Sequence, residues 1–328
     1  MTSSKSIKTS ILILSDTHGK DLIMPKCSVD VAIHCGDLTE DSKMEEYRTT
    51  LELLKSIDAP LKLVIAGNHD FSLDDSALER LTAEATESGI ETELMKKEFG
   101  DVGEARRLFS EASNVTLLDE GIHTFRLQNG ASLTVYASPF TPSLQASGAY
   151  QFRPDDNHDF SISLPGSNRV DVAITHCPPK GLFDRTSSAS PPSVGCPQLF
   201  AAIAKARPRL HCFGHIHENW GAKLVTWRGK EPTNTIPSHL TEIDNGASKP
   251  IDCLANYKPR KFESEQDVKE RKKRVERLYK EGCRRISDCP IAEKQTLFVN
   301  AALDVGPDED AEAREHVPWI VELELPSA

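Results

Sequence analysis

The sequence predicts an α/β fold, in which short buried strands alternate with helices. Five short apolar segments have the length and composition of strands buried on both faces, namely residues 11–14, 29–35, 61–66, 170–174 and 210–213. Helical patterns lie between them, at residues 40–56, 76–86, 102–111 and 196–206. In α/β sheets functional groups gather at the carboxyl ends of strands, so residues remote in sequence converge on one edge.

Length and composition describe an ordinary globular protein. The chain has 328 residues, of which 38% are hydrophobic and 27% charged. Its first ten residues are polar, and the apolar run that follows, residues 11–14, is too short for a signal peptide or a membrane-spanning helix. We therefore expect a cytoplasmic protein without a membrane partner.

Charge and cysteine content exclude two further classes. A formal net charge of −11 makes nucleic acid an unlikely partner, because phosphate backbones are held by clustered cations. Of the eight cysteines, Cys35, Cys177 and Cys212 lie within apolar runs, as small buried residues do. Free thiols are therefore expected rather than a disulfide framework.

Each predicted strand ends directly before a polar motif. The motifs are Ser-Asp-Thr-His-Gly, Cys-Gly-Asp, Gly-Asn-His-Asp, Thr-His-Cys-Pro-Pro and Gly-His-Ile-His, and they contain seven candidate metal ligands: Asp16, His18, Asp37, Asn68, His176, His215 and His217. Carboxylate, amide oxygen and imidazole suit hard-to-borderline divalent cations, whereas no thiolates are spaced for a structural zinc site. The set suggests two adjacent metal ions and hydrolysis of a phosphate ester by a metal-activated water.

Each motif taken alone has an ordinary structural explanation. Asp-x-His after a strand is usually a turn, Asp37 alone would more often cap a helix, and His176 could simply end a strand. Gly-Asn-His-Asp and Gly-His-Ile-His are more specific, because a turn needs no histidine and a core seldom contains two histidines one residue apart. The ordered set of five motifs carries the prediction.

With these motifs the chain resembles the calcineurin-like metallophosphoesterases over residues 9 to about 227 and again near its end. The resemblance implies a four-layer αββα sandwich of two mixed sheets with a dinuclear metal centre at the strand ends. It assigns Asp16, His18 and His217 to one metal, Asn68, His176 and His215 to the other, Asp37 as the bridge and His69 as the proton donor. The two divalent ions are expected to be manganese, iron or zinc, with magnesium possible.

A narrower resemblance concerns the small metallophosphoesterase-domain-containing subfamily, whose animal members are described as cyclic-nucleotide phosphodiesterases. Residues 64–69, 175–185 and 207–218 carry it, and residues 296–301 and 317–326 resemble its closing strands. Asp37 is followed by Leu38-Thr39-Glu40 instead of the Val-Asp-Arg-Gly of serine/threonine protein phosphatases. The missing arginine counts against a phosphoprotein and favours a small phosphodiester as substrate.

The expected mechanism is attack by a metal-bridging hydroxide, with His69 protonating the leaving group. An alternative role for His69 is only to orient Asn68. Candidate substrate contacts are Phe140, Arg153, Lys180 and Arg185, while His34 and His211 are expected to support the site rather than bind metal. Two other functions stay open, because fold does not fix substrate. They are hydrolysis of a non-phosphate ester or pathway-specific metabolite at an intact centre, and a non-catalytic metal-bearing scaffold.

Residues 1–328 are predicted to form a single domain with an insertion at residues 228–294 and closing strands at about 295–326. The insertion is expected to be irregular as far as residue 259 and helical over 264–285, starting from a serine cap. Its many lysines and arginines could bind an anion or a partner, but interleaved glutamates favour a solvated helix docked on the surface. The acidic residues 308–315 are expected to form a mobile loop.

Overall fold

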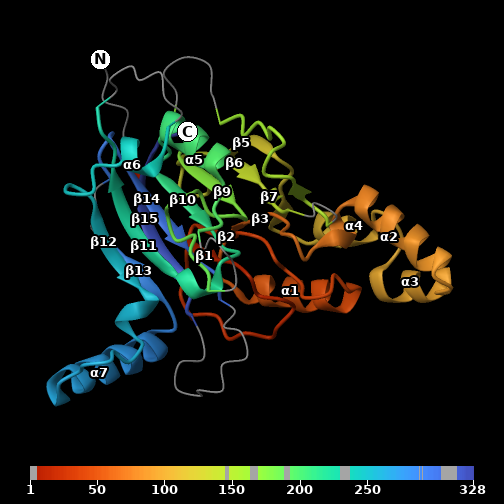
Figure 1. Ribbon diagram of the computed structural model, residues 1–328, viewed down its shortest axis with the longest axis horizontal. Helices are drawn as coiled ribbons and strands as arrows, with labels where there is room; N and C mark the ends of the chain where they lie inside the picture. Colours follow the sequence, from red (N-terminus) through yellow and green to blue (C-terminus); the bar gives the residue numbers. More distant parts are fainter. Residues whose placement is uncertain are drawn as a thin grey trace.

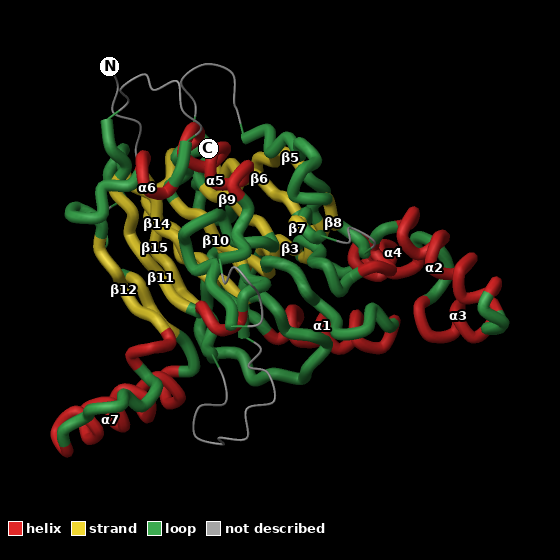
Figure 2. The backbone as a smooth tube through the Cα atoms, in the orientation of Figure 1, coloured by secondary structure: helices red, strands yellow, loops and turns green. Residues whose placement is uncertain are grey.

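Two mixed sheets pack face to face, with helices on the outer face of each (Figure 1, Figure 2). The computed structural model describes residues 6–144, 148–162, 169–187, 193–229, 237–287, 289, 291–303 and 316–328. The sheets, the helices and the candidate site are made of these described residues. Among them, no helix is both long enough and apolar enough to cross a membrane.

The first sheet has six strands, and its central strand β1 is flanked by β15 on one side and β2 on the other. β1 pairs parallel with β2, which pairs parallel with β3, whereas β15 runs antiparallel to β1. The order across the sheet is β13 (Arg284–Ile286), β15 (Trp319–Pro326), β1 (Ser6–Leu14), β2 (Val31–His34), β3 (Leu61–Val64) and β4 (Val115–Leu117).

The second sheet has seven strands, and parallel strands again form its centre. β10 pairs parallel with both β9 and β14, and the outer strands are antiparallel. The order is β12 (Lys249–Cys253), β11 (Gly221–Thr226), β14 (Gln295–Asn300), β10 (Leu210–Phe213), β9 (Val172–Thr175), β6 (Ser132–Ser138) and β5 (Gly121–Arg126). A separate pair joins β7 (Thr141–Pro142) to β8 (Gln151–Phe152).

The helices connect and cover these strands. They are α1 (Met44–Ser56), α2 (Asp75–Glu87), α3 (Thr92–Phe99), α4 (Glu104–Glu111), α5 (Pro197–Ala206), α6 (His239–Glu242) and α7 (Glu265–Glu281). Three short 3-10 turns are η1 (Phe71–Leu73), η2 (His217–Asn219) and η3 (Leu254–Asn256). α2 and α3 project from one end of the molecule, and α7 projects from the other (Figure 1).

The core has three apolar layers, as a four-layer sandwich requires. In β1, Ile11 and Ile13 enter the cluster between the sheets, whereas Leu12 and Leu14 enter the cluster under α1 and α4. Because side chains alternate along a strand, a run of four apolar residues fills both faces. The third cluster lies between the second sheet and α5, where Phe200 packs. The predicted α/β four-layer fold is confirmed.

Helix α1 begins later than the sequence pattern predicts, at Met44 instead of residue 40. The preceding residues form a turn around Glu46, whose carboxylate accepts hydrogen bonds from the backbone N–H groups of Asp41 and Lys43 at 3.1 and 2.8 Å. Ser42 has a left-handed backbone with φ 63°. A capping turn of this kind satisfies backbone N–H groups just before the helix, which the apolar pattern does not reveal.

The segment 228–294 contains more structure than expected. β12 and β13 add an edge strand to each sheet. Because α6 and β12 lie before residue 259, the prediction of an irregular stretch as far as that residue is wrong. α7 ends at Glu281, because Gly282 adopts a left-handed backbone (φ 63°) that terminates the helix before residue 285. The expected mobile loop at 308–315 lies outside the described residues. The single domain with an insertion stays a prediction.

All eight cysteines are free. Five of them, including Cys35, Cys177 and Cys212, are buried. The expectation of free thiols is therefore confirmed.

Candidate metal centre

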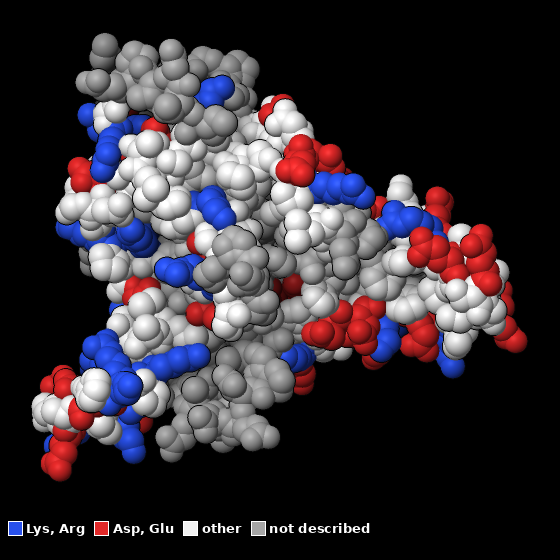
Figure 3. Space-filling model, in the orientation of Figure 1, with Lys and Arg blue, Asp and Glu red and all other residues white. Residues whose placement is uncertain are grey.

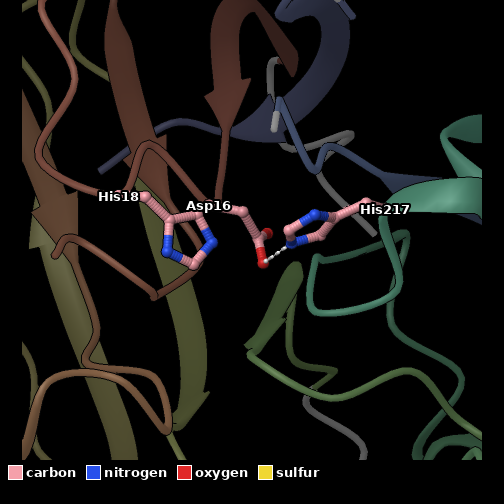
Figure 4. Close-up of side chains that lie close together, drawn as sticks. All are labelled: Asp16, His18 and His217. Atoms are coloured by element: carbon pink, nitrogen blue, oxygen red, sulfur yellow. Dashed lines mark hydrogen bonds and ion pairs between the residues drawn. The ribbon is translucent and has the colours of Figure 1, made fainter. Parts of the chain in front are cut away.

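The loops that follow five strands meet at one edge of the two sheets and bring the sequence motifs together. Three groups of side chains have ligand atoms within 4.8 Å of one another: Asp16, His18 and His217; His18, Asp37 and His69; Asp37, His176 and His215. Asn68 joins them, because its Oδ1 lies 3.0 Å from Nε2 of His176. The structure therefore gathers all seven predicted ligands and His69 in one cluster. Figure 4 shows Asp16 between His18 and His217.

Four of these residues have a left-handed backbone, which side chains other than glycine seldom adopt. The φ angles are 57° for Asp16, 48° for His18, 53° for Asp37 and 69° for His215. Each such residue costs of order 1–3 kcal/mol and persists only where surrounding contacts hold it. Backbone hydrogen bonds from Asp16 N to Gly36 O (2.9 Å) and from His18 N to Asp37 O (3.2 Å) supply such contacts. The strain is concentrated where the ligands must turn toward the centre.

Two glycines allow the loops to approach the carboxylates closely. A Cβ atom on Gly214 would lie 1.9 Å from Oδ2 of Asp16, and one on Gly67 would lie 2.2 Å from Oδ1 of Asp37. Both distances are far below van der Waals contact. Any side chain at these positions would displace a candidate ligand.

The two buried aspartates are held as carboxylates by neighbouring imidazoles and N–H groups. Burial alone would raise the pKa of Asp16, but the hydrogen bond and charge of His217 outweigh it and lower the pKa to about 2. Burial opposes ionisation of Asp37 in the same way, and the charge and hydrogen bond of His176 lower its pKa well below the usual range. Asp16 also accepts the backbone N–H of His215 at 3.0 Å. Asp37 accepts the backbone N–H of His69 at 3.0 Å.

His176 presents one ring nitrogen to the centre. Its Nδ1 lies 3.0 Å from the carbonyl oxygen of Cys35 and must donate to it, because a carbonyl only accepts. Without a metal, the charge and hydrogen bond of Asp37 outweigh burial and raise the pKa of His176 to about 9, so Nε2 carries a proton and faces Oδ2 of Asp37 at 3.2 Å. A bound cation would take the place of that proton. A backbone carbonyl that fixes the tautomer in this way is typical of histidines that bind metals.

Glu40 contacts two histidines of the cluster from the rim. Its carbonyl oxygen accepts from Nδ1 of His69 at 2.7 Å, and its carboxylate lies 3.0 Å from Nδ1 of His18. Nδ1 of His69 is thereby occupied, which leaves Nε2 as the ring atom available to other groups. Burial lowers the pKa of His69, but the charge of Asp37 and the bond to Glu40 outweigh it, so the pKa is raised overall.

Two supporting residues were not singled out from the sequence. Asp70 is fully buried, and its carboxylate accepts from the backbone N–H groups of Leu38 (3.1 Å), Thr39 (3.0 Å) and Gly67 (2.8 Å), which ties two ligand loops together. Asn300 is also buried and donates to the carbonyl oxygen of Ile216, between the two histidines of Gly-His-Ile-His, at 2.9 Å. Asn300 could have been noticed in the sequence, because it is a polar residue at the end of an apolar strand.

Two buried histidines support the site in matching positions. His34 on β2 lies with Nε2 2.9 Å from the hydroxyl of Thr17, and His211 on β10 lies with Nε2 2.9 Å from the hydroxyl of Thr175. Burial lowers the pKa of each histidine to about 3, so both rings are neutral near pH 7. Neither belongs to the groups of candidate ligands, in agreement with the sequence interpretation.

The four predicted substrate contacts are in varied surroundings. Phe140 packs against Tyr150 and His158, with ring centroids 6.0 and 4.6 Å apart. Lys180 donates from Nζ to the carbonyl oxygen of Ser193 at 2.5 Å, and Arg153 and Arg185 are exposed. Their role in substrate binding stays a prediction.

The donor set fits two divalent cations. The cluster offers two ionised carboxylates, an amide oxygen and several imidazoles, a mixture that suits manganese, iron or zinc better than an all-oxygen magnesium site. Asp37 and His18 each belong to two of the three groups, and of these two side chains the carboxylate has two equivalent oxygens with which to bind neighbouring ions. His176, with Nδ1 bonded to the carbonyl oxygen of Cys35, directs Nε2 toward the same carboxylate.

A family model for calcineurin-like phosphoesterases matches residues 9–219. The chain belongs to this family. The match spans the strands and loops that carry all the candidate ligands. Membership supports a hydrolase that acts on phosphoesters with divalent metals, and it confirms the resemblance found in the sequence.

Individual proteins show the same relationship. The human metallophosphoesterase domain-containing protein 1 is 30% identical over 222 residues, which cover 65% of this chain and 62% of that protein. The probable rhamnogalacturonate lyase C of Emericella nidulans is 31% identical over 219 residues, which cover 66% of this chain but 18% of that protein. The chain thus spans less than two thirds of these relatives. The solved phosphopantetheinyl hydrolase of Mycobacterium tuberculosis shares 13% identity with a TM-score of 0.36, over 70% of this chain and 87% of that one.

Proposed function

We propose that this chain is a dinuclear metal-dependent phosphodiesterase. The observation that carries the proposal is the convergence of seven candidate ligands from five loops, with Asp37 shared by two groups of ligand atoms. Asp16, His18 and His217 would hold one cation, Asn68, His176 and His215 the other, and Asp37 would bridge them. When bound, the two cations would lower the pKa of a water molecule and offset charge on the phosphoryl oxygens.

His69 is suited to protonate the leaving group. Its Nδ1 hydrogen is committed to the carbonyl oxygen of Glu40, so the ring is fixed and Nε2 remains for proton transfer. Its backbone N–H donates to Oδ1 of Asp37, which couples its position to the bridging carboxylate. A positioned imidazole contributes typically about 10²–10⁴-fold to turnover as a general acid.

The charge around the centre favours a phosphodiester over a phosphomonoester. The carboxylates of Asp16, Asp37 and Glu40 each lie beside an imidazole, those of His217, His176 and His18 respectively. The side chain of Glu40 is 54% exposed, and its carboxylate adds negative charge beside His18. A diester carries one negative charge, whereas a monoester carries close to two near pH 7 and is commonly held by an arginine clamp. The Leu38-Thr39-Glu40 sequence after Asp37 supplies no such clamp.

The test begins with metal-free protein loaded separately with Mn²⁺, Fe²⁺, Zn²⁺ and Mg²⁺. Specificity constants are then measured on bis-p-nitrophenyl phosphate, on p-nitrophenyl phosphate as the matched monoester, on cyclic nucleotides and on a phosphoserine peptide. We expect activity that requires added metal, with the diester and a cyclic nucleotide preferred over the monoester and the peptide. Metal analysis should give two ions per chain in the active preparation.

Two outcomes would overturn the proposal. A clear preference for the monoester or the phosphopeptide would contradict the charge argument. Hydrolysis of p-nitrophenyl acetate by the metal-loaded protein, without hydrolysis of any phosphate ester, would assign the centre to a non-phosphate ester instead.

A further inference from the structure

We propose that two copies of this chain associate side by side in opposite directions, so that a basic arm of each copy docks on an acidic arm of the other. The basic arm is residues 258–285, which contain α7. The acidic arm is residues 74–102, which contain α2 and α3. The two arms lie at opposite ends of the molecule along its longest axis (Figure 1).

Charge is strongly segregated between the two arms. The basic arm holds twelve lysines and arginines against six acidic residues, in a chain whose net charge is −11. The acidic arm holds nine aspartates and glutamates against three basic residues. Figure 3 shows mainly acidic side chains over α2 and α3, and lysines and arginines along α7 with acidic residues near its outer tip. The charges of the arms are therefore equal in size and opposite in sign.

The cations of α7 form a ridge on one face. Lys269, Lys273, Arg277 and Lys280 are spaced four, four and three residues apart, which places them on the same side of a helix. All four are exposed, and among the described residues none forms an ion pair. Leu278, the single buried residue of α7, lies about 100–180° around the helix axis from these cations and faces the body of the molecule.

The helices of the acidic arm have faces that the rest of the chain does not cover. α2 buries Ala77 and Leu78, so Glu79 and Glu87 lie on its outer side. α3 buries no residue at all, although it has eight residues. Isolated helices shorter than about 12–15 residues are marginal in water, because most helical stability comes from packing. A second protein surface against this arm would supply that packing.

Exposed apolar side chains also concentrate in the two arms. Eight large apolar residues are highly exposed among the described residues, and five of them lie in the arms. Ile90, Leu94 and Val102 are 43%, 52% and 44% exposed in the acidic arm, and Phe262 and Tyr279 are 91% and 43% exposed in the basic arm. Opposite charges together with exposed apolar side chains are typical of a protein interface, whereas a nucleic acid would bind mainly to the lysines and arginines.

The geometry favours a closed pair. If the two long axes are antiparallel, a two-fold axis places the basic arm of each copy on the acidic arm of the other. All four arms are then in contact. Both arms are visible on the one face shown in Figure 3, as contact with a single neighbouring molecule requires. A head-to-tail arrangement would instead leave an open arm at each end and form longer chains.

Charge reversal provides the test, with sedimentation velocity on the full chain as the measurement. The basic-arm variant carries Lys273→Glu and Arg277→Glu, and the acidic-arm variant carries Glu79→Lys and Glu87→Lys. We expect the wild type to form a dimer that weakens as salt rises from about 50 to 500 mM, because such contacts are screened. Each variant alone should raise the dissociation constant by more than about tenfold, since like charges then face each other.

Mixing the two variants distinguishes this pairing from a general charge effect. In the mixture the reversed arms are again complementary, so dimers should return to near the wild-type level. A control with Lys205→Glu and Lys294→Glu changes net charge as much as the basic-arm variant but at exposed positions outside both arms, and it should dimerise normally. Circular dichroism verifies that each variant is folded.

Three results would overturn the proposal. The first is a wild type that stays monomeric at low salt and high concentration, and the second is a mixture that fails to restore the dimer. The third is binding of duplex DNA or of phosphatidylserine vesicles that the basic-arm variant loses while dimerisation is unchanged, which would assign the ridge to another anion.

Discussion

The two sheets contribute different chemistry to the same centre. The loops after β1, β2 and β3 supply two carboxylates, an amide and two imidazoles, in Asp16, Asp37, Asn68, His18 and His69. The loops after β9 and β10 supply only imidazoles, in His176, His215 and His217. The negative charge of the candidate ligands therefore lies entirely on the first sheet.

The difference indicates which part of metal binding depends on each sheet. Carboxylates attract cations strongly and can bridge them, whereas neutral imidazoles add directed lone pairs that select borderline metals. Three of the four left-handed residues, Asp16, His18 and Asp37, also follow the first sheet. In the proposed dinuclear centre, the first sheet would supply the negative charge that holds both cations, and the second sheet would complete the set of ligands around each.

The largest effect should come from Asp37, the one carboxylate that is shared between two groups of ligand atoms. Asp37→Asn keeps the size of the side chain but removes the charge that would bridge both ions, so both metals and turnover should be lost together. Metal analysis of the purified variant with a diester assay measures this. His215→Ala, which affects one group only, is the matched control and should lose about one ion per chain. An Asp37→Asn protein with two ions and near-normal turnover would contradict the bridging role.

A smaller effect is expected at His69, which also lies in a loop after a strand of the first sheet. His69→Ala should retain both metals and lose turnover by roughly 10²–10⁴-fold on substrates whose leaving alcohol is a poor one. A p-nitrophenolate group needs little protonation, so the loss on bis-p-nitrophenyl phosphate should be much smaller than on a cyclic nucleotide. The ratio of the two losses is the measurement, with metal content determined in parallel. Equal losses, or loss of an ion, would make His69 a structural residue.

The candidate ligands could be predicted from sequence because each follows a short apolar strand directly. The sequence then gives both the type of the residue and its position at the sheet edge, as for Asp16 after β1. Position in the sandwich was predictable too, because a continuous apolar run such as residues 11–14 implies burial on both faces. The roles of these residues as ligands stay predictions.

Other features were not predictable, because they depend on contacts distant in sequence. β12 and β13 lack a strong strand pattern, and they form by pairing with β11 and β15. Asp70 supports the site through backbone groups 31 and 32 residues earlier in the chain. The opposite charges of the two arms are visible in composition, but their placement at opposite ends requires the fold.

The smallest expected effect concerns two threonines, one in each sheet, and it tests whether the two sheets support their candidate ligands in the same way. Thr17 stands between Asp16 and His18, and Thr175 precedes His176. Each hydroxyl lies 2.9 Å from Nε2 of a buried histidine on the neighbouring strand. Thr175 donates to the carbonyl oxygen of Cys177 at 2.8 Å, so His211 must donate to Thr175. Thr→Val preserves shape and removes the hydroxyl, leaving the histidine nitrogen unsatisfied in the core.

We expect Thr17→Val and Thr175→Val each to lower the free energy of unfolding by about 1–3 kcal/mol, the usual cost of a buried polar group without its partner. Each should also weaken metal binding, by roughly 10–100-fold, as loss of a supporting contact does at other metal sites. Chemical denaturation measures the first quantity and competition with a chelator the second. If the two sheets are equivalent, each variant weakens a different one of the two ions. A variant that is destabilised but binds both ions normally would show that its hydroxyl supports the fold alone, and that the two sheets hold their ligands by different means.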